Sequence, residues 1–243
     1  RRVDAIKLFL DGTLGGASAC MHAPFADRGH TAGLRTLGDD DAYSRMEAAH
    51  LAGLQVCVHA IGDKANADAA ALFDRLLRRH PGPHRHRVEH ASVLDPHTIE
   101  LFAEHQITCV VQPINLRSEA HWLAERLGSD RLPRAYPYRS LLAAGVPVAG
   151  SSDAPIEVSD VLAAMDAATD RQGLADEQSI TSIEALAMYT SGGSAARNTE
   201  DDLGTITPGA RADLVVLSGD LTTTTPAHLS VEATYISGLR YER

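Results

Sequence analysis

The sequence predicts an α/β fold: an incomplete (β/α)8 barrel that supplies about strands 4–8, followed by part of a small β-sandwich. Short apolar runs alternate with stretches of helical spacing, which favours parallel strands joined by helices. Several of these runs end at a polar side chain, as barrel strands do at the rim that carries chemistry. After about residue 200, this alternation gives way to short strand patterns separated by turns.

Five apolar runs are interpreted as the barrel strands. They are residues 3–12, 54–63, 86–92, 107–113 and 146–155. Lys7 and Phe9 share one face of the first strand, because side chains alternate along a strand. For the same reason, we expect Ala149, Ser151 and Asp153 on one face of the last strand. Their small neighbours would leave room there for a site.

Helical patterns fill the intervals between these runs. Apolar residues recur every three or four positions in residues 42–53, 66–80, 96–106, 138–145 and 158–171. We expect Gly53 and Gly145 to end their helices, because glycine adopts left-handed backbone angles without steric cost.

The last part of the chain differs from the rest. Residues 204–221 and 231–243 have strand patterns with Gly-containing turns and no helical spacing. We therefore divide the chain into a barrel portion, residues 1–200, and a partial β-sandwich, residues 201–243. The chain also begins directly in a strand pattern and without methionine, so we expect it to be a segment of a longer protein.

Composition excludes two classes of partner. The formal net charge is −10, from 22 Lys and Arg against 32 Asp and Glu, whereas nucleic acid or an anionic membrane surface would attract a basic face. No apolar stretch approaches the length of a membrane span. Cys20, Cys57 and Cys109 lack CxxC spacing, so we expect reduced thiols and a cytoplasmic location.

Four polar side chains at the strands indicate a metal site. Lys7, His59, His90 and Asp153 each lie at or near the carboxyl end of an apolar run. Neutral imidazoles and a carboxylate suit a divalent ion such as zinc. Such an ion lowers the pKa of bound water, and a nearby carboxylate can take up and return a proton. We therefore expect one or two divalent ions, with zinc as the metal.

A set of motifs in order then identifies a family. The motifs are KLFLDG (7–12), VHAIGDKAN (58–66), HRVEHA (86–91), QP (112–113), GSSDAP (150–155) and LGTITPGARADLVVL (203–217). Together they resemble amidohydrolase family 3 of the amidohydrolase superfamily, which includes N-substituted formamide deformylases. The resemblance covers essentially the whole chain. It implies a metal-dependent hydrolase that cleaves a carbon–nitrogen bond other than a peptide bond in a small amide or formamide.

The resemblance also implies residue roles. His59 and His90 would bind one metal ion, and Asp153 would bind the other and act as the general base. Lys7 would be carboxylated and bridge both ions. A lysine that points into a closed barrel is costly to keep charged, which favours the neutral amine that adds carbon dioxide.

Other residues are candidates for contact with the substrate. Gln112 follows the fourth strand, and Asp63 follows the second, where it could instead cap a helix. The long loops carry Trp122, Tyr136 and Tyr138, which could pack on an apolar substituent.

The chain departs from the family pattern at its metal ligands. The family's first strand carries a His-x-His pair, and the only such pair here, residues 84–86, leads into a strand instead of ending one. Five strands cannot close an eight-stranded barrel, so we expect the chain alone to be a poor catalyst. Three alternatives stay open: a deaminase on the same scaffold, a phosphate-binding barrel, and an inactive metal-binding remnant. Association as a homodimer also stays open.

Overall fold

The computed structural model describes residues 3–242 and contains one sheet of five parallel strands. The strands are β1 (Ala5–Phe9), β2 (Gln55–Ala60), β3 (Arg87–His90), β4 (Thr108–Val111) and β5 (Val148–Gly150). They pair in chain order, and helices lie between successive strands, as in consecutive units of a (β/α)8 barrel. The predicted α/β class and parallel sheet are confirmed.

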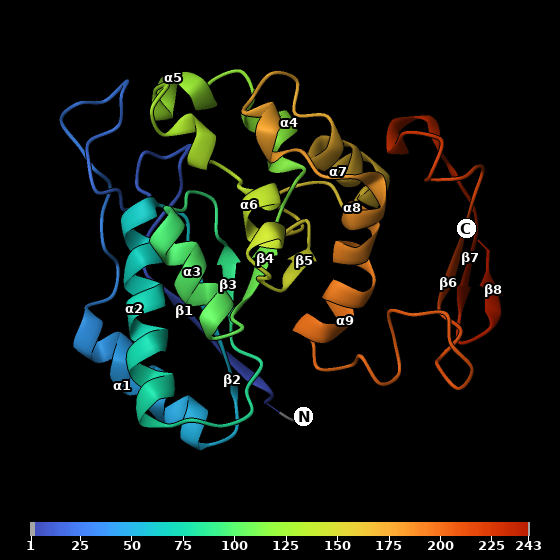
Figure 1. The fold of residues 1–243 in the computed structure, drawn as a ribbon, viewed down its shortest axis with the longest axis horizontal. Helices are drawn as coiled ribbons and strands as arrows, with labels where there is room; N and C mark the ends of the chain where they lie inside the picture. The colour runs from blue at the N-terminus through green and yellow to red at the C-terminus, as the bar shows by residue number, and fades with distance from the viewer. Residues whose placement is uncertain (1–2, 243) are drawn as a thin grey trace.

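Nine helices lie within residues 3–242, and two of them, both short, follow β4 directly. They are α1 (Asp39–Leu51), α2 (Asp63–Arg79), α3 (Pro96–Glu104), α4 (Asn115–Glu119), α5 (Leu123–Leu127), α6 (Tyr138–Ala143), α7 (Val161–Thr169), α8 (Ser182–Tyr189) and α9 (Ser191–Ala196). Figure 1 shows α2, α3 and α6 in front of the sheet and α7 to α9 beyond β5. Gly53 and Gly145 have positive φ of 72° and 77° just after α1 and α6, as predicted.

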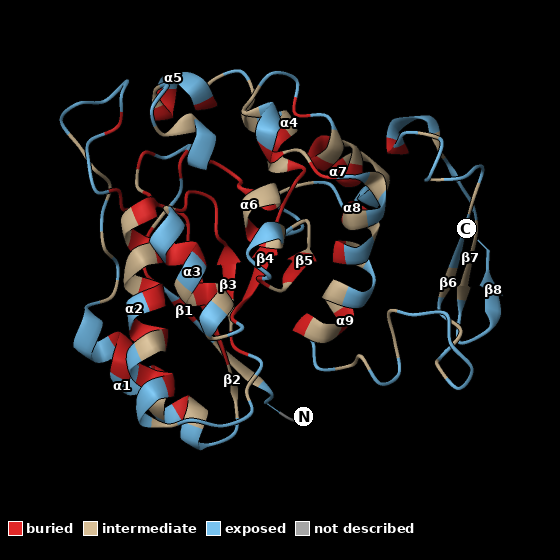
Figure 2. Ribbon diagram, viewed as in Figure 1, coloured by how far each residue is buried: buried red, intermediate tan, exposed pale blue. Residues whose placement is uncertain are grey.

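The two faces of the sheet are covered unequally. Val58 pairs with Leu8 and Val88 and is fully buried with Val88 under the helices. Figure 2 shows buried residues along β3 to β5 and on the sides of the helices that face them. On the opposite face Lys7 and Phe9 are exposed, Phe9 by 51%. The sheet therefore has an apolar face toward the helices, and its opposite face is exposed at β1, where Lys7 and Phe9 lie.

The last strand of this sheet is shorter than predicted. β5 ends at Gly150, and Asp153 has a positive φ of 55° in the loop that follows. The predicted alternation that placed Ala149, Ser151 and Asp153 on one strand face is therefore wrong. Alternation requires extended backbone, and residues 151–153 are no longer in a strand.

A second, antiparallel sheet forms the end of the chain. It contains β6 (Leu214–Leu217), β7 (Val231–Ile236) and β8 (Leu239–Tyr241), in that order. Figure 1 shows it beside α7 to α9, apart from the parallel sheet. The predicted boundary at residue 200 falls in the connection between α9 and β6. No helix within residues 3–242 is both long and apolar enough to cross a membrane.

Candidate metal centre

His59 and His90 meet at the carboxyl ends of β2 and β3. Their ring centroids are 4.5 Å apart, and the ring planes are inclined at 69°. Ala60 is the register partner of His90, so regular alternation would place the two histidines on opposite faces of the sheet. His90 instead has a φ of +76°, outside the strand region, and its ring lies against that of His59.

Gln112 determines which ring nitrogen of His90 carries hydrogen. His90 Nδ1 lies 2.8 Å from Gln112 Oε1. Gln112 Nε2 lies 3.2 Å from the carbonyl oxygen of Val110, which can only accept, so the amide orientation is fixed. His90 must therefore donate from Nδ1 to Gln112, and its Nε2 keeps the lone pair.

His90 is also held in its neutral form. Burial lowers the pKa of His90 to about 4, and the neighbouring His59 acts in the same direction. A neutral imidazole whose other nitrogen is hydrogen-bonded is the form that binds a divalent metal ion.

In His59 the other ring nitrogen, Nε2, faces the hydrogen-bond acceptors. Its Nε2 lies 3.0 Å from the carbonyl oxygen of Gly12 and 3.3 Å from Asp11 Oδ1. A carbonyl oxygen can only accept, so Nε2 donates and Nδ1 keeps the lone pair. His59 and His90 thus present two free lone pairs from adjacent rings, which is a donor set that fits zinc.

Lys7 lies on the same face as His59 but lower in the sheet. It pairs with Cys57, two residues before His59, which corresponds to about 6–7 Å along the strand. Its Nζ lies 4.9 Å from the ring centroid of Phe9, and the residue is exposed. The burial from which we predicted a neutral amine is therefore not found at Lys7.

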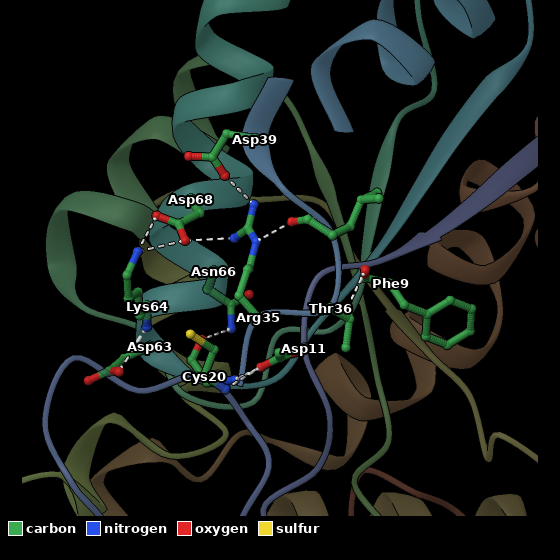
Figure 3. A network of polar contacts seen from close by, with 12 residues as sticks. Phe9, Asp11, Cys20, Arg35, Thr36, Asp39, Asp63, Lys64, Asn66 and Asp68 are labelled. Carbon is green, nitrogen blue, oxygen red and sulfur yellow. Dashed lines mark hydrogen bonds and ion pairs between the residues drawn. The ribbon is translucent and has the colours of Figure 1, made fainter. Parts of the chain in front are cut away.

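Within residues 3–242, Asp153 and Asp63 make no hydrogen bond or ion pair with the two histidines. Asp153 is exposed after β5, and its carboxylate makes no hydrogen bond or ion pair among the described residues. Asp63 is 4% exposed at the start of α2, where Oδ1 accepts 2.8 Å hydrogen bonds from the backbone N–H groups of His22 and Lys64. Figure 3 shows Asp63 beside Lys64 at this helix end.

Comparison with known proteins decides the family. Residues 1–240 match the Amidohydrolase family. The chain belongs to this family. It is 34% identical over 256 residues to YtcJ of Bacillus subtilis (strain 168), named as an amidohydrolase, covering 98% of this chain and 47% of YtcJ. It is 28% identical to the N-substituted formamide deformylase of Arthrobacter pascens, covering 100% of this chain and 46% of that protein.

A solved structure supports the same assignment. The crystal structure of an uncharacterized metal-dependent hydrolase from Pyrococcus horikoshii OT3 is 29% identical, with a TM-score of 0.84. The match covers 93% of this chain and 46% of that one. The amidohydrolase chain thus spans about half the length of the relatives that it matches.

The amidohydrolase chain has a polar side chain at the centre that the sequence patterns did not single out. Asp11 follows β1, its side chain has no exposed surface, and it lies beside His59. Its signal in the sequence is an acid placed directly after a buried apolar run, before a glycine. That signal is weak, because the same pair of residues commonly forms a turn.

Two of the aromatic residues proposed for the substrate pocket are buried. Tyr136 and Tyr138 are 2% and 0% exposed, and Tyr136 donates a 2.5 Å hydrogen bond to Glu119. The prediction that they pack on a substrate is wrong, since both belong to the core. Trp122 is partly exposed and lies against Gly15.

A second group of possible ligands lies away from the histidine pair. Within residues 3–242, the one group of three His, Cys, Asp or Glu side chains with all ligand atoms within 4.8 Å is Asp74, Glu104 and His105. Arg78 Nε lies 2.6 Å from Asp74, and Arg78 Nη2 lies 2.8 Å from Glu104. Because one guanidinium bridges both acids, we assign the group to an ion-pair network between α2 and the end of α3.

Proposed function

We propose that the chain carries the metal-binding centre of an enzyme that hydrolyses a non-peptide carbon–nitrogen bond in a small amide or formamide. The observation that carries this proposal is the pair of imidazoles, His59 and His90, whose fixed hydrogen bonds leave one lone pair on each ring. Membership of the amidohydrolase family supports it. The substrate class follows the name of the Arthrobacter pascens relative and belongs to the proposal.

Zinc is the proposed metal. His59 would bind it through Nδ1 and His90 through Nε2, and Lys7 and Asp153 would be further ligands. A zinc ion in such a site supplies a Lewis acid and makes hydroxide available near neutral pH. The carboxylated form of Lys7 is part of this proposal.

Asp153 is the proposed general base. Its carboxylate is free of other hydrogen bonds and reaches solvent at the carboxyl end of β5. It would accept a proton from the attacking water and return that proton to the departing nitrogen. Gln112 and Asp63 are the proposed substrate contacts, and Gln112 also orients His90.

We also propose that the enzyme works in the cytoplasm on a small-molecule amide. Cys20, Cys57 and Cys109 are free and buried, and burial raises the pKa of each thiol. Such thiols are unreactive and compatible with a reducing compartment. Association as a homodimer stays a proposal, to be tested by light scattering.

Zinc content and amide hydrolysis test the function together. The chain, and the longest natural polypeptide that contains it, are loaded with zinc and supplied with a panel of N-substituted formamides and amides. We expect zinc binding that His59→Ala and His90→Ala each weaken, whereas His97→Ala, at an exposed position of α3, does not. Hydrolysis by that polypeptide supports the enzyme. Zinc binding without hydrolysis of any amide would support the inactive remnant instead.

A further inference from the structure

Asp11 is a buried carboxylate beside the metal centre. We propose that Asp11 is a positioning residue that fixes the ring of His59 with Nδ1 free for the metal. This inference deepens the proposed function and rests on it for the identity of the ligand. The orientation of His59, however, can be measured without any metal.

The Asp11 carboxylate joins the two loops that follow β1 and β2. Oδ2 accepts hydrogen bonds from the backbone N–H groups of Cys20 at 2.9 Å and Gly62 at 2.8 Å, and Oδ1 accepts one from Ile61 at 3.1 Å. Figure 3 shows Asp11 pointing toward Cys20 within this network. Three backbone donors hold both oxygens of Asp11 in place, so the carboxylate cannot turn away from His59.

His59 faces two oxygen acceptors at the same nitrogen. Its Nε2 is 3.0 Å from the Gly12 carbonyl oxygen and 3.3 Å from Asp11 Oδ1. If the hydrogen moved to Nδ1, the Nε2 lone pair would face a carbonyl dipole and a negative charge at these distances. Both contacts would then be repulsive, so the structure favours hydrogen on Nε2.

The contact between the Gly12 carbonyl oxygen and His59 depends on glycine at this position. A Cβ at Gly12 would lie 2.2 Å from Ser18 Oγ and 3.1 Å from the Ser18 carbonyl oxygen. Gly12 N also donates a 3.2 Å hydrogen bond to that carbonyl. The absence of a side chain at Gly12 therefore lets residues 11–12 fold tightly against the next turn, with the Gly12 carbonyl oxygen turned to His59.

A carboxylate next to a ligand histidine has a chemical effect as well as a steric one. It makes the opposite ring nitrogen more basic, and loss of such a partner typically weakens metal affinity 10- to 100-fold. Asp11 would thus act through His59 and would touch neither the metal nor the substrate. A residue that only anchored the two loops would leave the tautomer of His59 unchanged.

Long-range 1H–15N NMR spectra of the metal-free chain test this role. We expect hydrogen on Nε2 of His59 in the wild type. Asp11→Asn places an amide NH2 opposite Nε2, so we expect a shift toward hydrogen on Nδ1 and a 10- to 100-fold loss of zinc affinity. His90 serves as the internal control, since Gln112 fixes its hydrogen on Nδ1 in both proteins.

A matched variant separates positioning from loop anchoring. Asp63→Asn also alters a buried carboxylate that accepts two backbone hydrogen bonds, and we expect it to leave the His59 tautomer unchanged. If Asp11→Asn does not fold, Asp11→Ser removes the charge within the same space and is measured in the same way. Hydrogen on Nδ1 of wild-type His59, or an unchanged tautomer in the folded Asp11 variant, would overturn the inference.

The test of the His59 tautomer does not depend on the proposed function. A wild-type chain that binds no zinc would end the metal-centre proposal, whereas the His59 tautomer would still report on Asp11. Conversely, normal zinc binding with an unchanged His59 tautomer in Asp11→Asn would end the inference about Asp11 and leave the metal centre standing.

Discussion

Gln112 and His90 connect the ends of β4 and β3 through a 2.8 Å hydrogen bond between two buried side chains. Gln112→Ala removes the acceptor of the His90 Nδ1–H group and leaves the imidazole free to rotate. We expect zinc affinity to fall about 10- to 100-fold in a competition assay with a chromophoric chelator. Gln106→Asn, at the end of α3, serves as the surface control. Equal affinity in wild type and Gln112→Ala would show that Gln112 does not orient a ligand.

Asp153→Asn tests the proposed general base. The amide cannot accept a proton, so we expect kcat for amide hydrolysis to fall about 10²- to 10⁴-fold. The rate is measured in the longest natural polypeptide that contains the chain. Glu157→Gln alters another acid of the same loop, which accepts a hydrogen bond from Ser118, and we expect it to retain most activity. A similar loss in both variants would argue against a special role for Asp153.

A series of hydrogen bonds through His86 and His50 predicts that the folded protein loses stability in acid. The Val56 N–H group donates to His86 Nδ1 at 3.1 Å, so His86 Nε2 carries hydrogen and donates to His50 Nδ1 at 2.8 Å. His50 Nε2 in turn donates to the carbonyl oxygen of His80 at 3.0 Å. Protonation of His86 would disrupt this arrangement.

The sign of the effect follows from the pKa of His86. Burial lowers the pKa of His86 to about 3, with repulsion from His84 and His50 adding to the shift. An unfolded histidine takes up a proton near pH 6.5. The folded state is therefore fully stabilised above about pH 6.5 and loses free energy of unfolding as pH falls from there toward 3. Urea denaturation at pH 7 and pH 5 measures this slope.

The variant His86→Asn keeps an acceptor for Val56 without a titrating ring, and we expect a smaller loss of stability between pH 7 and pH 5. His97→Asn, on the surface of α3, should keep the wild-type slope. An unchanged slope in His86→Asn would place the acid sensitivity elsewhere in the protein.

Arg126, in α5, holds the loop that follows β1. Its Nε lies 2.9 and 2.8 Å from the two carboxylate oxygens of Asp27, and its Nη1 donates to the carbonyl oxygens of Leu14 and Gly15. The Arg126 side chain is 8% exposed and that of Asp27 is 17% exposed. Arg126→Ala leaves Asp27 without its partner, so we expect the free energy of unfolding to fall by about 3 kcal/mol in urea denaturation.

Arg134→Ala, at an exposed position, provides the control, with an expected change below about 0.5 kcal/mol. A loss of less than about 1 kcal/mol in Arg126→Ala would mean that the pair behaves as an ordinary surface ion pair.

The sequence was sufficient for the order of elements and for the position of His59 and His90 at the ends of their strands. Burial requires apolar residues at the spacing of a strand or a helix, so these elements can be recognised in the sequence. Each predicted strand of the barrel portion is found. The pairing of His59 with His90 could not follow from alternation, because it depends on the positive φ of His90. The end of β5 at Gly150, which leaves Asp153 in a loop, could not be predicted from alternation either.

Contacts between distant segments explain the remaining differences. Asp11 resembles a turn residue until its backbone partners at Cys20, Ile61 and Gly62 are known. Gln112 follows β4, and only the folded structure shows that its side chain is directed to His90. The sequence places both residues at strand ends correctly, but only tertiary packing determines what their side chains contact.

Anomalous X-ray diffraction at the zinc absorption edge, from crystals of the zinc-loaded chain, tests the proposed metal centre most directly. We expect one zinc peak within bonding distance of His59 Nδ1 and His90 Nε2. A peak only at Asp74, Glu104 and His105, or a zinc ion bound through His59 Nε2, would contradict it.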